Sequence, residues 1–337
     1  MEDPLNSRVG VAGCGETLEA RGGVKILRGI AVVTHCVERL DVAETAWSSV
    51  LHYVTVESGR LTPAHCAAWA TSAALGQRYC LMRPASGEAV YLRFIETGER
   101  GHAPPATWGW NATELLVTDP DDLARRLRGT GFRHLGGPGD LYPRPKAPRA
   151  MQVIGPSGEL VYFTRLLPGG SRYGLRQASS YVDRPFIVTV GASSGTRLHD
   201  FYGGVLGHRI LERVPFVNSI LAALCGTAPD TVFPTAVASI PGRRFLLEMD
   251  EYPPHVPPRP VRCGHLPPGM SMVSFTVRGL DALAQGTAGI TPRAPPLALD
   301  GVAYGGRRVM VIEGAVGEWL ELIEGDTGGR PAGNSSP

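Results

Sequence analysis

Two glutamates lie in strand-like segments where alternation places Glu321 between apolar neighbours and Glu248 between Leu246 and Asp250. In the segment GEWLELIE, Glu321 shares one face with Trp319 and Ile323, because successive side chains of a strand point to opposite faces. Glu248 has the same position in the segment FLLEMDE. An ionised carboxylate in such a place is costly unless it is paired or bound to a metal. Both are therefore candidate catalytic groups; the alternatives are solvated glutamates on a sheet face or partners of a nearby arginine.

An arginine and a tyrosine occupy the corresponding positions of two other strand-like segments. Arg93 shares a face with Tyr91, and Tyr162 lies in the segment ELVYFTRL. Neither Arg93 nor Tyr162 is a usual ligand of a divalent ion. An arginine facing a cleft favours an anionic substrate group, which it binds through two parallel hydrogen bonds; otherwise it neutralises a neighbouring carboxylate. The aromatic residues Tyr91, Tyr162 and Trp319 would line a pocket for a flat organic ligand or pack in the core.

One histidine lies within a valine-rich segment. His35, in IAVVTHCV, shares a face with Val33 and Val37. It is either a hydrogen-bonded core residue or a group that transfers protons or binds a metal.

An internal repeat organises the segments that carry these residues. Strand, helix and strand over residues 30–59 recur over residues 186–214, and Val50 matches Val205 at an offset of 155 residues. Arg93 matches Glu248 at the same offset, and Gly158 matches Gly317 at 159. The repeat predicts four units of similar plan, over residues 25–97, 108–167, 184–251 and 270–324.

We expect an α+β protein of two tandem domains, each built from two βαβββ modules that form cup-shaped mixed sheets. The first domain covers residues 25–168 and the second 184–325, with a linker over 169–183. Residues 1–24 and 326–337 lack apolar periodicity and are expected to be mobile. The modules could pair as first with second, or as first with fourth.

The composition excludes several functional classes. Hydrophobic residues make up 43% of the chain and charged residues 19%, as in ordinary globular proteins. No stretch approaches the ~20 apolar residues of a membrane span, and the N-terminus has no apolar segment typical of a secretory signal. The 33 basic and 31 acidic residues give a net charge of +2, so nucleic acid is not an expected partner. The six cysteines show no paired spacing, which favours reduced thiols in a cytoplasmic protein.

The sequence resembles the vicinal oxygen chelate superfamily, which includes glyoxalases, bleomycin-resistance proteins and extradiol dioxygenases. The resemblance covers most of residues 25–324 and is carried by THCVERLD, the turn FYGGVLG and the closing strand GEWLELIE. It implies βαβββ modules that pair around a small-molecule cleft. It also places the family's acidic metal ligand at Glu321, the duplicate of that ligand at Glu248, and the first histidine ligand at His35.

The metal-ligand set that this resemblance implies is incomplete. If the first module pairs with the second, His35, Arg93 and Tyr162 share one cleft, and the two glutamates share the other. If it pairs with the fourth, His35 meets Glu321. Neither arrangement gives the three ligands of a His-His-carboxylate iron site. We therefore expect either iron, manganese, zinc or nickel held with the help of a loop residue, or no metal.

The leading hypothesis is an enzyme of vicinal-oxygen-chelate type that acts on a small aromatic or carboxylated metabolite as an isomerase, lyase or ring-opening enzyme. A metal, or an arginine or histidine of the cleft, would polarise a substrate oxygen. Catalysis is assigned to His35, Glu248 and Glu321, and substrate binding to Arg93, Tyr162, Tyr91 and Trp319. The alternative is a metal-free protein that binds and sequesters a small molecule. The expected partner in either case is a small molecule and not a membrane, with the chain a monomer or homodimer.

Overall fold

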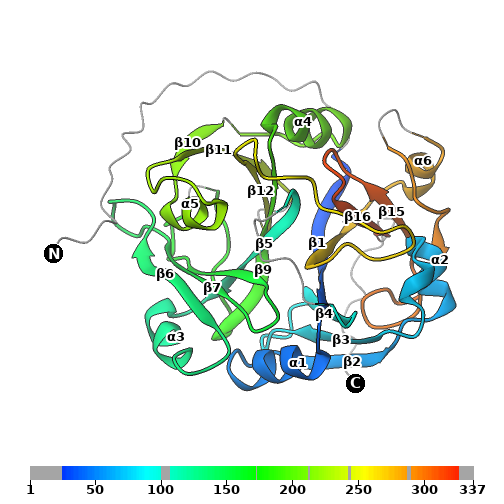
Figure 1. The fold of residues 1–337 in the computed structure, drawn as a ribbon, viewed down its shortest axis with the longest axis horizontal. Helices are drawn as coiled ribbons and strands as arrows, with labels where there is room; N and C mark the ends of the chain where they lie inside the picture. The colour runs from blue at the N-terminus through cyan, green and yellow to red at the C-terminus, as the bar shows by residue number, and fades with distance from the viewer. Residues whose placement is uncertain are drawn as a thin grey trace, which may run out of the picture.

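The computed structural model describes residues 25–99, 107–171, 173–211, 213–241, 244–286 and 290–325. Residues 1–24 and 326–337, which were expected to be mobile, lie outside the described residues. The described chain forms two eight-stranded mixed sheets with short helices around them (Figure 1).

The first sheet combines the first and last modules of the chain, and we call it the terminal sheet. Its strand order is β14-β15-β16-β13-β1-β4-β3-β2. The first module contributes β1 (Leu27–Val37), α1 (Leu40–Ser49), β2 (Val54–Arg60), α2 (Pro63–Trp69), the 3-10 turn η1 (Ser72–Ala74), β3 (Arg78–Arg83) and β4 (Tyr91–Glu96). The last module contributes β13 (Met270–Val277), α6 (Leu280–Ala284), β14 (Leu297–Ala298), β15 (Arg308–Glu313) and β16 (Trp319–Glu324).

The second sheet combines the two middle modules, and we call it the central sheet. Its strand order is β10-β11-β12-β9-β5-β8-β7-β6. The second module contributes β5 (Gly109–Val117), α3 (Pro120–Arg126), β6 (Arg133–Asp140), β7 (Arg149–Ile154) and β8 (Leu160–Arg165). The third contributes β9 (Val182–Ala192), α4 (Gly195–His199), the π-helical turn η2 (Asp200–Val205), β10 (Val214–Val217), α5 (Ser219–Cys225), β11 (Val232–Ser239) and β12 (Leu246–Glu251). Over the residues described, no helix has the length and apolar character to cross a membrane.

The two sheets share one plan. In the middle of each sheet the first strands of two modules pair antiparallel, β1 with β13 and β5 with β9. The last strand of each module runs parallel beside its own first strand, as β4 does beside β1 and β16 beside β13. The first module therefore pairs with the fourth and the second with the third. The predicted α+β fold of βαβββ modules in two cup-shaped sheets is confirmed.

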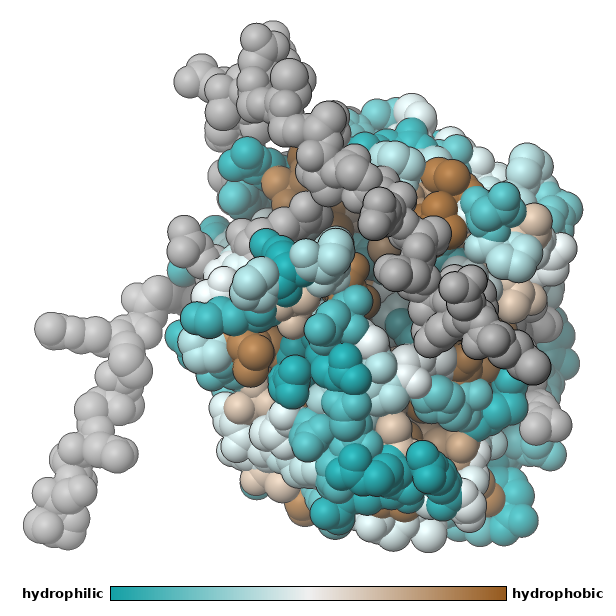
Figure 2. Space-filling view, turned by 90° about the vertical axis from the view of Figure 1, so that its left-hand side faces the viewer, coloured by the Kyte–Doolittle hydropathy of each residue, from teal (hydrophilic) through white to brown (hydrophobic). Residues whose placement is uncertain are grey.

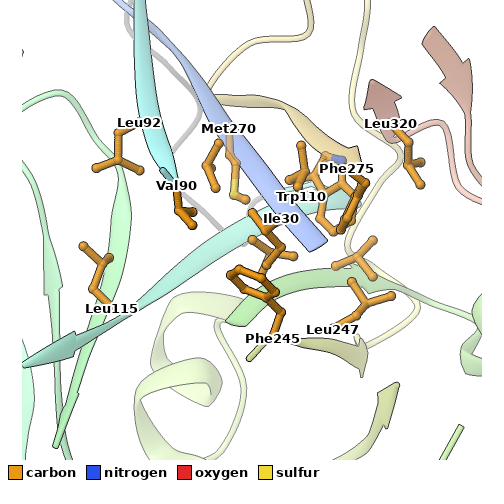
Figure 3. Packing of buried hydrophobic residues seen from close by; sticks show 14 of the residues in the cluster. Ile30, Val90, Leu92, Trp110, Leu115, Phe245, Leu247, Met270, Phe275 and Leu320 are labelled. Atoms are coloured by element: carbon orange, nitrogen blue, oxygen red, sulfur yellow. The ribbon is translucent and has the colours of Figure 1, made fainter. Parts of the chain in front are cut away.

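A large hydrophobic cluster joins the two sheets to their helices. Side chains on one face of each sheet form it, including Leu92 and Leu320 of the terminal sheet and Leu115 and Leu247 of the central sheet (Figure 3). Trp110 of β5 lies where the sheets meet, and its Nε1 donates to a main-chain oxygen of the terminal sheet at 2.8 Å. Each fully buried leucine contributes roughly 1.5–3 kcal/mol. The opposite faces, which we call the inner faces, form the interiors of a terminal cup and a central cup.

Candidate ligand-binding site

The terminal cup contains a buried ion pair between two neighbouring modules. Arg93 lies in register with Thr34, and Glu321 with Ser274, so all four side chains share the inner face. Arg93 Nη2 donates to Glu321 Oε2 at 3.3 Å, and the two side chains are only 3% and 0% exposed. Arg93 Nε and Nη2 also donate to Thr34 Oγ1 at 3.1 and 2.9 Å. Arg93 therefore neutralises a carboxylate inside its own cup.

Two aromatic side chains complete the hydrogen bonds of the Glu321 carboxylate. Trp69 Nε1 donates to Oε1 at 2.7 Å, and the Tyr304 hydroxyl donates to the same oxygen at 2.9 Å. The Ser274 hydroxyl donates to the other oxygen. The Arg93 guanidinium lies 4.6 Å from the centre of the Trp69 ring, a favourable cation–π geometry. Every partner that holds this carboxylate thus comes from the protein itself.

The ionisation of Arg93 fits this closed arrangement. Burial alone would lower its pKa, but Tyr304 and Glu321 beside it raise the pKa above the ordinary value of an arginine. The side chain therefore stays charged and keeps its hydrogen bonds within the cup.

Helix α2 positions the indole that closes the terminal cup. Thr62 caps its start: the Thr62 side chain accepts from the main-chain nitrogen of His65 at 3.4 Å, and His65 Nδ1 accepts from the main-chain nitrogen of Thr62 at 3.3 Å. Pro63 supplies the first turn, where its missing N–H is not needed. The helix ends at Ala70, whose φ of 54° turns the chain away directly after Trp69.

The two aromatic residues predicted to bind substrate in this half are buried in the terminal cup. Tyr91 and Trp319 belong to one apolar cluster with Trp69 and Tyr304, and Trp319 is 1% exposed. The Arg293 guanidinium lies 3.8 Å from the centre of the Trp319 ring. A cavity of about 210 Å³ near the end of β1 is lined by residues such as Cys36 and His265, and not by Arg93 or Glu321.

His35 lies on the face opposite to the inner face of β1. Its neighbour Thr34 contacts Arg93, so alternation turns the imidazole toward the hydrophobic cluster between the sheets. There the ring stacks on Phe94, with centres 5.7 Å apart. Burial, helped by the charge of Arg259, lowers the pKa of His35 to about 4. The structure therefore does not bring His35 together with Glu321 or Glu248.

The central cup carries Glu248 at the position that Glu321 has in the terminal cup. Glu248 lies in register with Thr189 on the first strand of its module, as Glu321 does with Ser274. Glu248 is only partly exposed, and the exposed part lines a cavity. The same backbone position thus presents a carboxyl group to an open space.

A tyrosine and a second glutamate replace the arginine and threonine of the terminal cup. Tyr162 lies in register with Glu114, as Arg93 does with Thr34. Glu114 is 9% exposed and lines the same cavity as Glu248. The central cup therefore has a second carboxyl group where the terminal cup has a hydroxyl.

The carboxyl groups of the central cup hold their protons more tightly than ordinary carboxyl groups. Burial raises the pKa of Glu114 to about 7. Burial, and then the charges of Asp250 and Glu114, raise the pKa of Glu248 well above its usual value. Burial also raises the pKa of Asp250 to about 6, although Thr235 donates a hydrogen bond to it at 2.8 Å. At neutral pH the cup therefore contains both protonated and ionised carboxyl groups.

The cavity above these carboxyl groups has a volume of about 140 Å³ and mainly apolar walls. Ile187, Val237 and Leu246 lie among its lining residues. Its lining also includes four large side chains that are 37–39% exposed: Leu141, Tyr142, Val214 and Phe216. The side of the molecule that carries β6 and β10 faces the viewer in Figure 2, and apolar residues are visible there among hydrophilic ones. An apolar cavity with a few polar groups is the usual form of a small-molecule site.

No family model and no curated protein matches the chain. Among solved structures, a variant of glyoxalase I from Zea mays has a TM-score of 0.59 at 13% identity, covering 88% of this chain and 93% of that chain. The protein has the vicinal oxygen chelate fold. Glyoxalase I from Zea mays itself has a TM-score of 0.57 at 13% identity, covering 88% of this chain and 92% of that chain. A putative dioxygenase from Bacillus subtilis has a TM-score of 0.56 at 11% identity, covering 90% and 87%. At such identities these likenesses establish the vicinal oxygen chelate fold, and the reaction depends on the residues in the cups.

The metal expected for a vicinal oxygen chelate protein does not fit the residues predicted to bind it. Glu321 lies in the terminal cup with its carboxylate fully hydrogen-bonded, Glu248 lies in the central cup, and His35 lies in the core. Within the ranges that the structure covers, no group of three or more His, Cys, Asp or Glu side chains could hold a metal ion.

The structure also assigns importance to residues that the sequence did not single out. Glu114 lies on the first strand of its module, and Trp69 and Tyr304 lie outside the closing strands. Aligning the first strands of the modules against their closing strands places Glu114 beside Tyr162, and this register is the signal that would have found it. The contacts of Trp69 and Tyr304 span 252 and 17 residues and leave no comparable pattern in the sequence.

Proposed function

We propose that the central cup binds a small, largely apolar organic molecule and that Glu114 and Glu248 transfer protons to and from it. The observation that carries this proposal is the cavity of about 140 Å³ with the carboxyl groups of the buried Glu114 and the partly exposed Glu248 in its lining. Proton transfer of this kind belongs to isomerase and lyase reactions. The terminal cup, with its internally satisfied ion pair, serves as a scaffold.

The raised pKa values give the two glutamates different tasks. With its pKa raised well above the usual value by burial and by the neighbouring acidic groups, Glu248 holds its proton more tightly than an ordinary glutamate and can act as a general acid. Glu114, with a pKa of about 7, is partly ionised at that pH and can act as a general base. Two carboxyl groups whose surroundings separate their pKa values are a recurring way to combine an acid and a base in one site. Apolar walls exclude water and preserve this difference.

Binding without turnover is the second candidate function. The large apolar side chains of the cavity lining favour it, because a site that only sequesters a molecule needs contact area and not proton transfer. The two functions make the same cavity the binding site and differ only in what the glutamates do.

Solvent-deuterium exchange separates the two functions. Ligands are first selected by thermal shift from small aromatic amines, alcohols and acids, and their C–H exchange in D2O is then followed by NMR at saturating ligand. For an enzyme, Glu114→Gln should slow exchange about 100-fold or more, since a positioned acid or base contributes about that factor. The exposed control Glu38→Gln should exchange like the wild type. Bound ligand without protein-dependent exchange or conversion would favour sequestration.

A further inference from the structure

The central cup concentrates acidic groups without a basic side chain to balance them. Glu114 on β5, together with Glu248 and Asp250 on β12, lies on or beside the inner face. Among the described residues, no arginine, lysine or histidine acts on the pKa of any of these three groups. The terminal cup has Arg93 for this purpose. The central cup therefore lacks the cation that its counterpart carries.

A hydroxyl group gives a second sign of a missing partner. Thr164 Oγ1 is buried, its residue is only 1% exposed, and it forms no well-aligned hydrogen bond, although it lies close enough to Glu114 to lower the pKa of that group. Thr164 lines the cavity together with Glu114 and Glu248. A buried hydroxyl without a well-aligned partner is costly, and a ligand donor in the cavity would satisfy it.

The shape of the cavity limits the body that carries such a donor. A volume of about 140 Å³ is close to that of an engineered apolar cavity of roughly 150 Å³ that binds benzene. Ile187, Val237 and Leu246 offer apolar contacts to a ring. A ligand of this size with one polar end would pack its body against the apolar walls and place its polar end beside Glu114, Glu248 and Thr164.

We propose that the molecule bound in the central cup is an organic cation, an amine on a small aromatic or apolar body. Its ammonium group lies between the carboxylates of Glu114 and Glu248 and donates to Thr164 Oγ1, while its body packs against the apolar walls. This inference rests on the proposed function, because it specifies the class of molecule that enters the same cup. The ligand cation takes the place that the Arg93 guanidinium has in the terminal cup.

Binding of a cation beside Glu114 and Glu248 should release protons. Glu114 and Glu248 give up the protons they hold when an ammonium group arrives, so affinity rises with pH while the amine stays charged. The other titratable or charged groups that face them are Tyr162 on β8, Asp250 on β12, and Tyr142, Arg144 and Tyr173 in the cavity lining. Arg144 is exposed and donates to the main-chain oxygen of Gly170 at 3.0 Å, so it does not neutralise Glu114 or Glu248.

Calorimetry with three probes of matched size tests the inference on the full chain. Benzylamine, benzyl alcohol and benzoate are titrated at pH 6 and pH 8 in buffers of different ionisation enthalpy. We expect benzylamine to bind at least tenfold more tightly than the other two. Its affinity should rise at least tenfold from pH 6 to pH 8, with release of up to about two protons, because Glu114 ionises in this interval and Glu248 gives up its proton as well.

Variants locate the effect. Glu248→Gln and, as a second variant, Glu114→Gln should each weaken benzylamine at least tenfold and leave benzyl alcohol within a factor of about three, since only the charge is removed. Thr164→Val should weaken benzylamine by a smaller factor, and the exposed control Glu38→Gln should leave it unchanged. Circular dichroism confirms that each variant is folded.

The outcomes separate this inference from the proposed function. If benzyl alcohol or benzoate bound as tightly as benzylamine, the inference that the ligand is a cation would be wrong, although the cup would still be a binding site. Equal benzylamine binding by wild type and both glutamate variants would also overturn it. If none of the three probes binds, the inference is wrong, and deuterium exchange with other ligands then decides the proposed function independently.

Discussion

The terminal and central cups have the same arrangement of strands. Each has a glutamate on the closing strand of one module, and the two cups differ in the residue at the matching position of the other module. In the terminal cup Arg93 faces Glu321, and aromatic side chains complete the hydrogen bonds of the carboxylate. In the central cup Tyr162 takes the position of the arginine, and Glu248 lines a cavity with Glu114. Where the carboxylate pairs with a cation of the protein, the polar groups of the cup are satisfied internally. Where it lies near another carboxyl group, the cup keeps a cavity and unbalanced negative charge that a ligand can use.

Removal of the arginine should have the largest effect, because it takes away what distinguishes the terminal cup. Arg93→Met leaves Glu321 buried without its cation, and we expect the free energy of unfolding to fall by about 3–5 kcal/mol. Urea denaturation measures this loss. As a control, Arg39→Met removes an exposed partner of Asp41 and should leave the free energy of unfolding nearly unchanged. A similar small effect for Arg93→Met would contradict a structural role for the ion pair.

The pH dependence of stability should expose the opposite character of the central cup. Folding raises the pKa of Glu114 from 4.5 to about 7, so the folded state binds the proton more tightly than the unfolded state. Its contribution is therefore fully present below pH 4.5 and is lost as the pH rises toward 7, by an amount on the order of 3 kcal/mol.

Glu114→Gln cannot titrate and isolates this contribution. Relative to the wild type, its free energy of unfolding should increase between pH 5 and pH 8, as measured by urea denaturation at both values. Parallel pH profiles for the two proteins would show that Glu114 is not buried as an acid in the folded state.

The indole that closes the terminal cup should have an intermediate effect. Trp69→Phe keeps an aromatic ring and removes the hydrogen bond from Nε1 to Glu321, which should cost about 2 kcal/mol because the acceptor is charged. The measurement is thermal or urea unfolding, with ligand affinity as the comparison. If the central cup is the binding site, its ligand affinity should be unchanged; a parallel loss of affinity would mean that the two cups are not independent.

The smallest expected effect concerns the helix that carries this indole. Thr62→Ala removes the side-chain cap of α2 and should lower the free energy of unfolding by about 1 kcal/mol. Thr62→Ser keeps the hydroxyl and should recover most of the loss. Equal losses for both variants would mean that the hydroxyl is not what stabilises the start of the helix.

Alternation along single strands correctly predicted which residues share a face. Glu321 shares its inner face with Trp319 and Ile323, as the spacing indicates, and their placement follows from local geometry alone. The same rule separates His35 from Arg93, because Thr34, one residue earlier, is the one that contacts the arginine. The sequence alone did not show which of two adjacent residues on that strand faces the cup.

Contacts between distant modules were not readable in this way. The repeat is equally compatible with pairing the first module with the second or with the fourth, because every module has an edge of similar pattern. The pairing of β1 with β13 joins residues about 240 apart and brings Glu321 to Arg93, whereas His35 is separated from Glu321 because it lies on the opposite face of β1. Trp69 contacts Glu321 from a short helix, and no residue spacing around Trp69 predicts this contact.

The most direct test of the account is a crystal structure of the protein soaked separately with benzylamine, benzyl alcohol and benzoate. We expect ligand density in the central cup beside Glu114 and Glu248, while the Arg93–Glu321 pair of the terminal cup stays closed. Density in the terminal cup with that ion pair opened, or a central cup that stays empty at saturating concentrations of all three compounds, would contradict it.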